Sequence, residues 1–226
     1  MFKGFFLFYL LSIITRNPLL ALILLVVLYV VADKAYFGFL PDLFAPVKRS
    51  QRIRALQDQL ALNPADANAA QELGILFFEK KKYSRAVGYL EQANKKVTNS
   101  ARLYLYMGMA YMEMKETEKG KQELDQAVEL DRRVGHGIPY IFLLDYELKK
   151  PSDNAEMVKR LEEGLTGFAN TENFFRMGMV YKKAGDRQKA RDMFEKALSE
   201  YSYVPRRMRR IHRKWAVFSR FQLLSS

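Results

Sequence analysis

Hydrophobic and polar positions divide the chain into an apolar beginning, a periodic amphipathic middle and a basic end. Eleven of the thirteen residues from Leu19 to Val31 are Leu, Ile or Val. With the apolar residues that follow, this run reaches the roughly 20 residues that a bilayer core requires. Pro18 is suited to the first turn of such a helix. We therefore expect a transmembrane helix over residues 18–40.

A shorter apolar run precedes this segment. Residues 5–14 are too few to cross a bilayer as a helix that rises about 1.5 Å per residue. The short apolar segment 1–17 is therefore expected to lie in the interface, to form half of a re-entrant hairpin or to extend the span as a kinked helix. A cleaved signal peptide is the alternative, but the apolar region is too long for one and no A-x-A-like site follows it.

The middle of the chain repeats a helical pattern. Three segments carry a large apolar residue, then a glycine, then an aromatic residue three positions later, and their glycines are Gly74, Gly108 and Gly178. Each segment is followed by a second amphipathic helix, at 83–97, 116–130 and 187–201, with small residues seven positions apart. Small residues let two helices approach closely, and the aromatic side chain fills the gap between them. Gly74 and Gly108 are 34 residues apart.

This pattern resembles the tetratricopeptide repeat family, whose unit is a 34-residue helix–turn–helix. The resemblance implies an all-α fold with a TPR-like α-solenoid of about four repeats over residues 67–203, which follows the N-terminal transmembrane helix expected from the apolar run. The third repeat, residues 138–169, is the weakest. It has Asp145 in place of the first-helix glycine, three extra residues in the loop around Gly135, and a turn at residues 151–154. A basic juxtamembrane linker and helix, residues 41–66, precedes the repeats, with the helix expected over residues 50–62.

The last segment, residues 204–226, is basic and amphipathic. Its apolar residues recur at spacings of four and three, which is one face of a helix: Val204, Met208, Ile211, Trp215 and Phe218. We expect a capping helix that packs this stripe on the last repeat and leaves a solvated outer face. The cations of that face are Arg206, Arg207, Arg209, Arg210, Arg213 and Lys214. They are interpreted as a solvated surface, a contact for membrane lipid or a site for an acidic partner. Nucleic acid is the weakest interpretation, because the aromatic residues belong to the apolar stripe.

Composition excludes several classes of function. The chain has 37 Lys and Arg against 25 Asp and Glu, but the excess lies at its two ends, unlike that of a domain that binds nucleic acid across its face. The absence of cysteine excludes disulfides, thiolate metal sites and a cysteine nucleophile. We find no phosphate-binding loop, paired carboxylates or nucleophile elbow in the sequence. We therefore expect no enzyme, no cofactor and no metal site.

The inner surface of the solenoid is the candidate site. The resemblance implies that positions 2, 5, 9 and 12 of each first helix line an inner groove that binds a helix or an extended segment of a protein partner. Methionine-rich apolar grooves suit such ligands because the side chain adapts its shape. The predicted groove residues are Gln71, Ile75, Phe78, Leu105, Met109, Met112, Phe142, Tyr146, Phe175 and Met179. The alternative is that the helix over residues 50–62, or a one-residue error in register, buries them.

The family's carboxylate clamp of Lys and Asn is missing, because Gln71, Ile75, Leu105 and Met109 stand at the matching positions. Chaperone C-termini are therefore an improbable ligand class. The predicted mechanism is insertion of a partner helix or strand along Leu105, Met109, Phe142 and Phe175.

Two cations precede the expected membrane span and five follow it, which favours a cytoplasmic location for the repeats. One span followed by repeats also resembles bacterial membrane-anchored repeat proteins of envelope biogenesis, which implies the bacterial inner membrane. The sequence thus predicts a non-enzymatic, membrane-anchored adaptor or scaffold that binds a partner protein within a membrane complex. The alternatives are a lipid-surface-binding spacer or oligomerisation subunit, and an envelope assembly or chaperone factor if the repeats are periplasmic.

Overall fold

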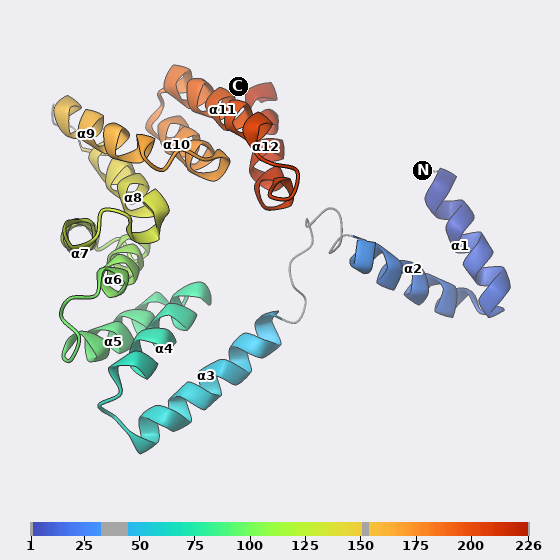
Figure 1. Ribbon diagram of the computed structural model, residues 1–226, viewed down its shortest axis with the longest axis horizontal. Helices are drawn as coiled ribbons and strands as arrows, with labels where there is room; N and C mark the ends of the chain where they lie inside the picture. Colours follow the sequence, from blue (N-terminus) through green and yellow to red (C-terminus); the bar gives the residue numbers. More distant parts are fainter. Residues whose placement is uncertain (1, 33–44, 151–153, 226) are drawn as a thin grey trace. The chain divides into compact units, whose positions relative to one another are not determined.

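The computed structural model describes residues 2–32, 45–150 and 154–225, and every regular element in these ranges is helical (Figure 1). The described residues fall into two compact units. One unit contains α1 and α2 together with residues 204–214, and the other contains residues 45–203 together with the remainder of the C-terminal helix. The all-α solenoid expected from the sequence is present in the second unit.

Helices α1 (Phe2–Thr15) and α2 (Pro18–Ala32) pack against each other across a tight turn. Arg16 takes a left-handed φ of 50° there, and the Asn17 carboxamide caps α2 by accepting hydrogen bonds from the N–H groups of Leu19 (2.9 Å) and Leu20 (3.3 Å). Among the described side chains of the two helices, Ala21 alone is buried. The pair therefore presents an apolar surface on almost all sides.

Helix α2 covers residues 18–32 of the predicted membrane span, and residues 33–40 lie outside the described part of the chain. Within the ranges that the structure describes, no helix combines the length and the apolar character needed to cross a membrane.

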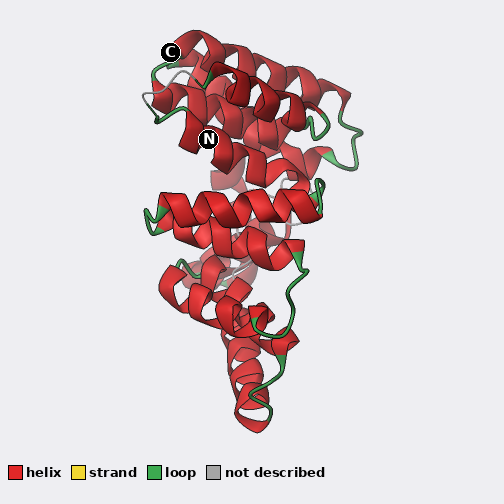
Figure 2. Ribbon diagram, turned by 90° about the vertical axis from the view of Figure 1, so that its left-hand side faces the viewer, coloured by secondary structure: helices red, strands yellow, loops and turns green. Residues whose placement is uncertain are grey.

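The second unit consists of antiparallel helix pairs preceded by one long helix (Figure 1). The pairs are α4 (Ala67–Glu79) with α5 (Tyr83–Asn94), α6 (Ala101–Glu113) with α7 (Thr117–Leu130), α8 (Ile138–Glu147) with α9 (Ala155–Thr166), and α10 (Thr171–Ala184) with α11 (Arg187–Tyr203). The preceding helix is α3 (Ala45–Leu62), and the last is α12 (Arg209–Leu224). Figure 2 shows the paired helices joined by short loops.

The helices of a pair approach most closely at the glycines that define the repeat. A Cβ atom added to Gly108 on α6 would lie 2.6 Å from Leu124 Cγ and 2.9 Å from the Gly120 carbonyl oxygen on α7. Side chains do not pack at such distances, so any side chain here would push the two helices apart. The glycine therefore sets the spacing within the pair.

The third pair achieves its close approach differently. Gly164 lies on the second helix, α9, directly beneath the ring of Tyr140, whose Cε1 atom is 2.6 Å from the position of an added Cβ. Asp145, expected where the first-helix glycine would stand, instead forms ion pairs with Lys149 and with Lys183 (3.3 Å). The small residue of this repeat is therefore on its second helix, and Asp145 occupies the position that the glycine has in the other first helices.

The extra residues before α8 form a strained turn, η2 (Val134–Gly137). Gly135, His136 and Gly137 have φ angles of 61°, 50° and 92°, three consecutive left-handed residues. The turn is held by Asn173, whose side-chain amide donates to the His136 carbonyl oxygen at 2.8 Å. Gly135 packs on the side chain of Leu105, so the turn covers part of α6.

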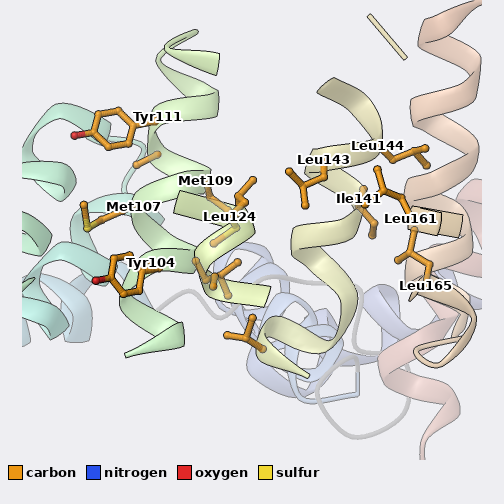
Figure 3. Close-up of a cluster of buried hydrophobic side chains, with 14 of the residues drawn as sticks. Tyr104, Met107, Met109, Tyr111, Leu124, Ile141, Leu143, Leu144, Leu161 and Leu165 are labelled. Atoms are coloured by element: carbon orange, nitrogen blue, oxygen red, sulfur yellow. The ribbon is translucent and has the colours of Figure 1, made fainter. Parts of the chain in front are cut away.

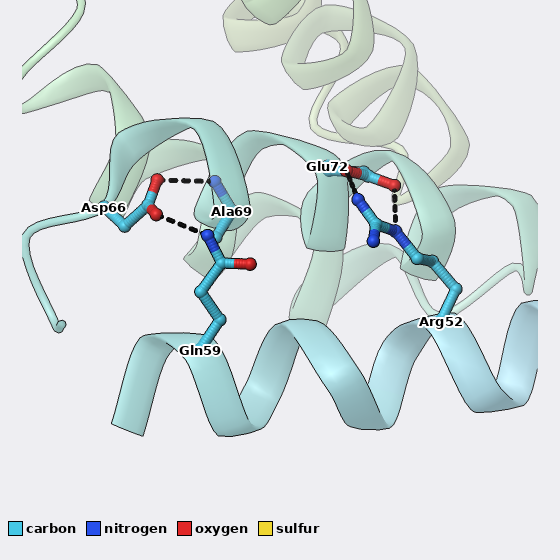
Figure 4. Close-up of polar contacts among 5 residues, drawn as sticks. All are labelled: Arg52, Gln59, Asp66, Ala69 and Glu72. Atoms are coloured by element: carbon cyan, nitrogen blue, oxygen red, sulfur yellow. Dashed lines mark hydrogen bonds and ion pairs between the residues drawn. The ribbon is translucent and has the colours of Figure 1, made fainter. Parts of the chain in front are cut away.

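Helix α3 packs on the first repeat and begins at Ala45, five residues before its expected start. Its Ile53 and Leu56 are buried against α4 and α5. Figure 4 shows two polar contacts beside this core: Arg52 pairs with Glu72 at 2.6 Å, and Gln59 donates to Asp66, which caps α4. The hydrogen bonds from the Ala69 N–H and from Gln59 lower the pKa of the Asp66 carboxyl. Helix α3 thus covers the first repeat.

Neighbouring pairs share one core and one type of polar contact. Figure 3 shows the core residues of α6 to α9, including Met109, Leu124, Leu144 and Leu161. At each junction a first-helix tyrosine donates its hydroxyl to a glutamate on the preceding second helix. The contacts are Tyr111 to Glu91 (2.8 Å), Tyr146 to Glu118 (2.6 Å) and Tyr181 to Glu162. Burial and the adjacent carboxylate raise the pKa of all three hydroxyls, which keeps them protonated as donors.

We expect Gly108→Ala to destabilise the solenoid by about 1–3 kcal/mol, the usual cost of overpacking. Gly88 on α5 is the matched control, because an added Cβ there meets nothing within 4 Å. Gly88→Ala should raise stability by up to about 1 kcal/mol through helix propensity alone. Urea unfolding of the two variants checks this, and equal stability of both would contradict the packing described for Gly108.

We also expect Glu123→Gln, on α7, to raise the melting temperature at neutral pH. Glu123 is half-buried, its Oε2 has no hydrogen-bond partner among the described residues, and burial, followed by the charge of Glu91, raises its pKa. Ionisation of Glu123 in the folded protein therefore opposes folding. This cost disappears at pH values below the ordinary pKa of 4.5, where the carboxyl is protonated in both the folded and the unfolded states. The gain should fade as pH decreases towards that value. Glu129→Gln, exposed on the same helix, is the control for the loss of one carboxylate and should leave the melting temperature at neutral pH near that of the wild type.

Candidate partner-binding groove

The groove lies along α8 and α10, with one wall supplied by α12. It encloses about 600 Å³. Its apolar side chains come from three helices: Ile141 and Phe142 from α8, Phe175, Met179 and Val180 from α10, and Trp215 from α12. Its polar lining consists of Glu113, Asp145, Arg176, Lys182 and Lys183. An apolar floor with a few charged groups at its edge is the usual form of a binding cleft.

Phe175 is the centre of an aromatic cluster that forms the wall of the groove. Its ring centroid lies 5.4 Å from that of Trp215, 5.8 Å from Phe194 and 6.0 Å from Phe218. The Arg176 guanidinium lies over the Trp215 ring at 5.3 Å, a cation–π contact. These contacts join α10, α11 and α12.

Charges of both signs lie along the edge. Asp145 accepts from Lys183 at 3.3 Å, and Lys182 donates to the Gln222 side chain at 2.6 Å. These pairs are solvent-exposed and contribute little to stability. They leave the edge polar and the floor apolar.

Three of the predicted groove residues line this cleft: Phe142, Phe175 and Met179. Met179 is the most open of them, with 38% of its surface exposed. The structure brings Phe142 to the other two, which lie more than thirty positions later in the sequence, because α8 and α10 are neighbours in the stack.

Four other predicted groove residues are buried in the core: Ile75, Leu105, Met109 and Tyr146. Leu105 is covered by the turn at Gly135, and Tyr146 points to Glu118 on α7. These side chains are not available on an open surface. The expected insertion path along Leu105 and Met109 therefore does not exist in this structure, and the path is confined to Phe142 and Phe175.

The remaining three predicted residues are half-buried by neighbours in their own part of the chain. Phe78 packs between Tyr83 and Tyr106, with ring centroids 5.5 Å and 5.4 Å away. Gln71 lies 3.5 Å from the Ser100 hydroxyl, and Met112 packs over Gly120. Side chains of the first two repeats thus fill their own part of the predicted groove.

Helix α12 differs from its prediction in two ways. It begins at Arg209, and residues 206–208 form a turn, so Arg206 and Arg207 precede the helix. Its buried residues are Ala216 and Ser219, whereas Phe218 is about half exposed. The expectation that the whole apolar stripe packs on the last repeat was wrong, because small residues allow the helix to dock closely along an adjacent face. Arg209, Arg210, Arg213 and Lys214 lie in its first half.

Sequence reasoning missed Ile141, Val180, Arg176 and Trp215 as groove residues. Trp215 was assigned to the buried stripe of the capping helix. Two features of the sequence could have indicated Trp215: it is the only tryptophan of the chain, and it lies on a helix that directly follows the last repeat.

A second cleft, of about 680 Å³, is lined mainly by cations and two aromatic rings. Its lining includes Arg132, Arg133, His136, Arg160, Tyr140 and Phe168. None of the predicted groove residues lies there. Its cationic lining does not suit an apolar segment, so the groove along α8 and α10 is the candidate site for one.

Family models described as tetratricopeptide repeats match residues 77–134 and 172–202. These two segments of the solenoid match the tetratricopeptide repeat, and together they cover less than half of the chain. The first match runs from the end of α4 through α7, and the second covers α10 and α11. Helix α8 lies between the two matches, so the groove forms where the repeat pattern of the sequence is weakest.

Several solved structures share the fold. MamA aligns with a TM-score of 0.52 and 20% identity over 73% of this chain and 97% of that chain. YrrB, described as a TPR protein with an unusual peptide-binding site, aligns with a TM-score of 0.53 and 18% identity over 76% of this chain and 87% of that chain. The C-terminal part of a TPR protein from Cytophaga hutchinsonii aligns with a TM-score of 0.53 and 18% identity over 78% of this chain and 67% of that chain. Among curated proteins, none matches the chain in sequence.

Proposed function

We propose that this tetratricopeptide protein is a membrane-attached adaptor that binds an amphipathic segment of a partner protein in the groove along α8 and α10. The groove carries the proposal: its floor is apolar, its volume is about 600 Å³ and its edge is charged. Tetratricopeptide repeats are typically non-catalytic modules that present extended binding surfaces. YrrB, which has a similar fold, is described as having a peptide-binding site, and this supports a segment of protein as the ligand.

The lining of the groove favours a helix with one apolar face as its occupant. Met179 and Phe142 lie on facing helices and offer flexible and flat apolar surfaces. A bound helix would place its anchors at i, i+3 or i+4, and i+7 along this floor. Lys182 and Lys183 at one edge suit acidic side chains that flank those anchors, and Asp145 suits a basic one.

The N-terminal helices supply the proposed attachment to a membrane. Phe5, Ile14 and Leu19 are each about 70% exposed, and α1 and α2 are apolar on almost every side. A helix that is hydrophobic all round requires the interior of a protein or a bilayer. The proposed span over residues 18–40, the location in a bacterial inner membrane and the cytoplasmic side for the repeats rest on the sequence and its balance of cations.

Met179→Asp should reduce partner binding at least tenfold, because a carboxylate in the apolar floor would have to be desolvated on binding. Met157→Asp is the matched control: Met157 is 41% exposed on α9, outside the groove. Both variants should unfold at the wild-type temperature. Site-specific photo-cross-linking in cells, with a benzophenone amino acid at position 179 or 157, identifies the partner. Equal cross-linking at both positions, or none at 179, would overturn the groove as the binding site.

Leu24→Arg combined with Val27→Arg should shift the full chain from the membrane fraction to the alkaline-carbonate supernatant. Each arginine costs roughly 2.5–3.5 kcal/mol near the centre of a bilayer helix. Leu62→Arg on α3 is the control, because Leu62 is already 89% exposed and lies outside the apolar helices. If the double variant remains in the membrane pellet as the wild type does, α2 is not the attachment.

A further inference from the structure

Helix α12 has an apolar face that the repeats leave uncovered. The helix docks through Ala216, Ser219 and Leu223, which follow one another at spacings of three and four and so lie on one side. Ser219 is fully buried and Ala216 nearly so. Larger apolar side chains of the same helix point elsewhere.

Those larger side chains are exposed. Val217 is 47% exposed, Phe218 49%, Phe221 66% and Leu224 83%. Phe221 and Leu224 are one helical turn apart, and Val217 and Phe218 lie one turn before them, so the four form a continuous patch on the second half of α12. A contiguous patch of this kind on a folded domain marks an interaction site.

The charge around this patch has one sign. Residues 204–226 contain seven cations and no acid, whereas residues 63–203 contain 23 cations and 22 acids. Arg206, Arg207, Arg210 and Arg220 are exposed and form no ion pair within the described ranges. Apolar side chains flanked only by cations complement the acyl chains and phosphates of an anionic lipid surface.

We propose that α12 lies on an anionic bilayer surface, with Phe221, Val217 and Leu224 inserted between the headgroups and the arginines in contact with lipid phosphates. An acidic protein surface is the alternative occupant, and the comparison of neutral with anionic vesicles distinguishes it from a bilayer. The proposal is separate from the groove: of the four patch residues only Phe218 contacts the groove wall, through Phe175, and Phe218 is not among the side chains that we propose to insert.

The test uses the full chain, which has no natural cysteine. Phe221→Cys carries an environment-sensitive fluorophore, and the protein is mixed with vesicles of phosphatidylcholine alone or with added phosphatidylglycerol. We expect a blue shift, and quenching by nitroxide-labelled acyl chains, only with phosphatidylglycerol. The same fluorophore at Gln126→Cys, exposed on α7, should not respond.

Charge reversal supplies the second arm of the test. Arg210→Glu with Arg220→Glu should weaken the fluorescence response to phosphatidylglycerol vesicles at least tenfold. Lys95→Glu with Lys96→Glu, an equal change of charge at the exposed end of α5, should leave the response of the Phe221→Cys label unchanged.

Three results would overturn the proposal. An equal response with neutral vesicles would show that charge is not recognised. A blue shift without vesicles that grows with protein concentration would assign the patch to a second copy of the chain. Absence of acyl-chain quenching with anionic vesicles would exclude insertion. Failure of the proposed N-terminal attachment is a separate result, because it releases the chain from neutral vesicles. The proposal for α12 is judged by the fluorescence of the label at position 221 with anionic vesicles.

Discussion

The close approach of two helices at a glycine is the contact on which the rest of this structure depends. At Gly108 the backbone of α6 lies against Leu124 and the carbonyl of Gly120, and this sets the distance within the pair. A single pair cannot bury its apolar faces, so each must stack on the next. The tyrosine–glutamate bond at every junction then fixes how neighbouring pairs meet, because a buried hydroxyl needs a partner.

The third repeat has no glycine on its first helix, and this difference determines where the groove lies. With its small residue on α9 rather than on α8, Asp145 is left at the edge of the groove, where it pairs with Lys183. The strained turn before α8 has the opposite effect on the preceding repeat, since it covers Leu105. One irregular repeat therefore closes the surface on one side of itself and opens it on the other.

The features that depend on the local spacing of residues could be predicted from the sequence. The glycines 34 residues apart and their paired small residues predicted the helices and their order, because these contacts join segments close in the chain. The burial of Leu105 could not be predicted, since it depends on the path of a turn thirty residues later. The docked face of α12 was missed for a related reason: hydrophobic periodicity points to Phe218, whereas close packing selected Ala216 and Ser219. The apolar N-terminal run was correctly read as helical in residues 18–32, and its membrane role stays a prediction.

Trp215 is the only tryptophan of the protein, and it stands in the wall of the groove between Phe175 and Arg176. An indole ring changes its emission when a neighbouring charge moves or when water leaves its surface. When the protein is excited at the red edge of its absorption, where tyrosine does not absorb, its intrinsic fluorescence is consequently a signal from one place. A spectroscopist can therefore follow occupancy of the groove directly, in detergent or in a membrane, without altering a single residue.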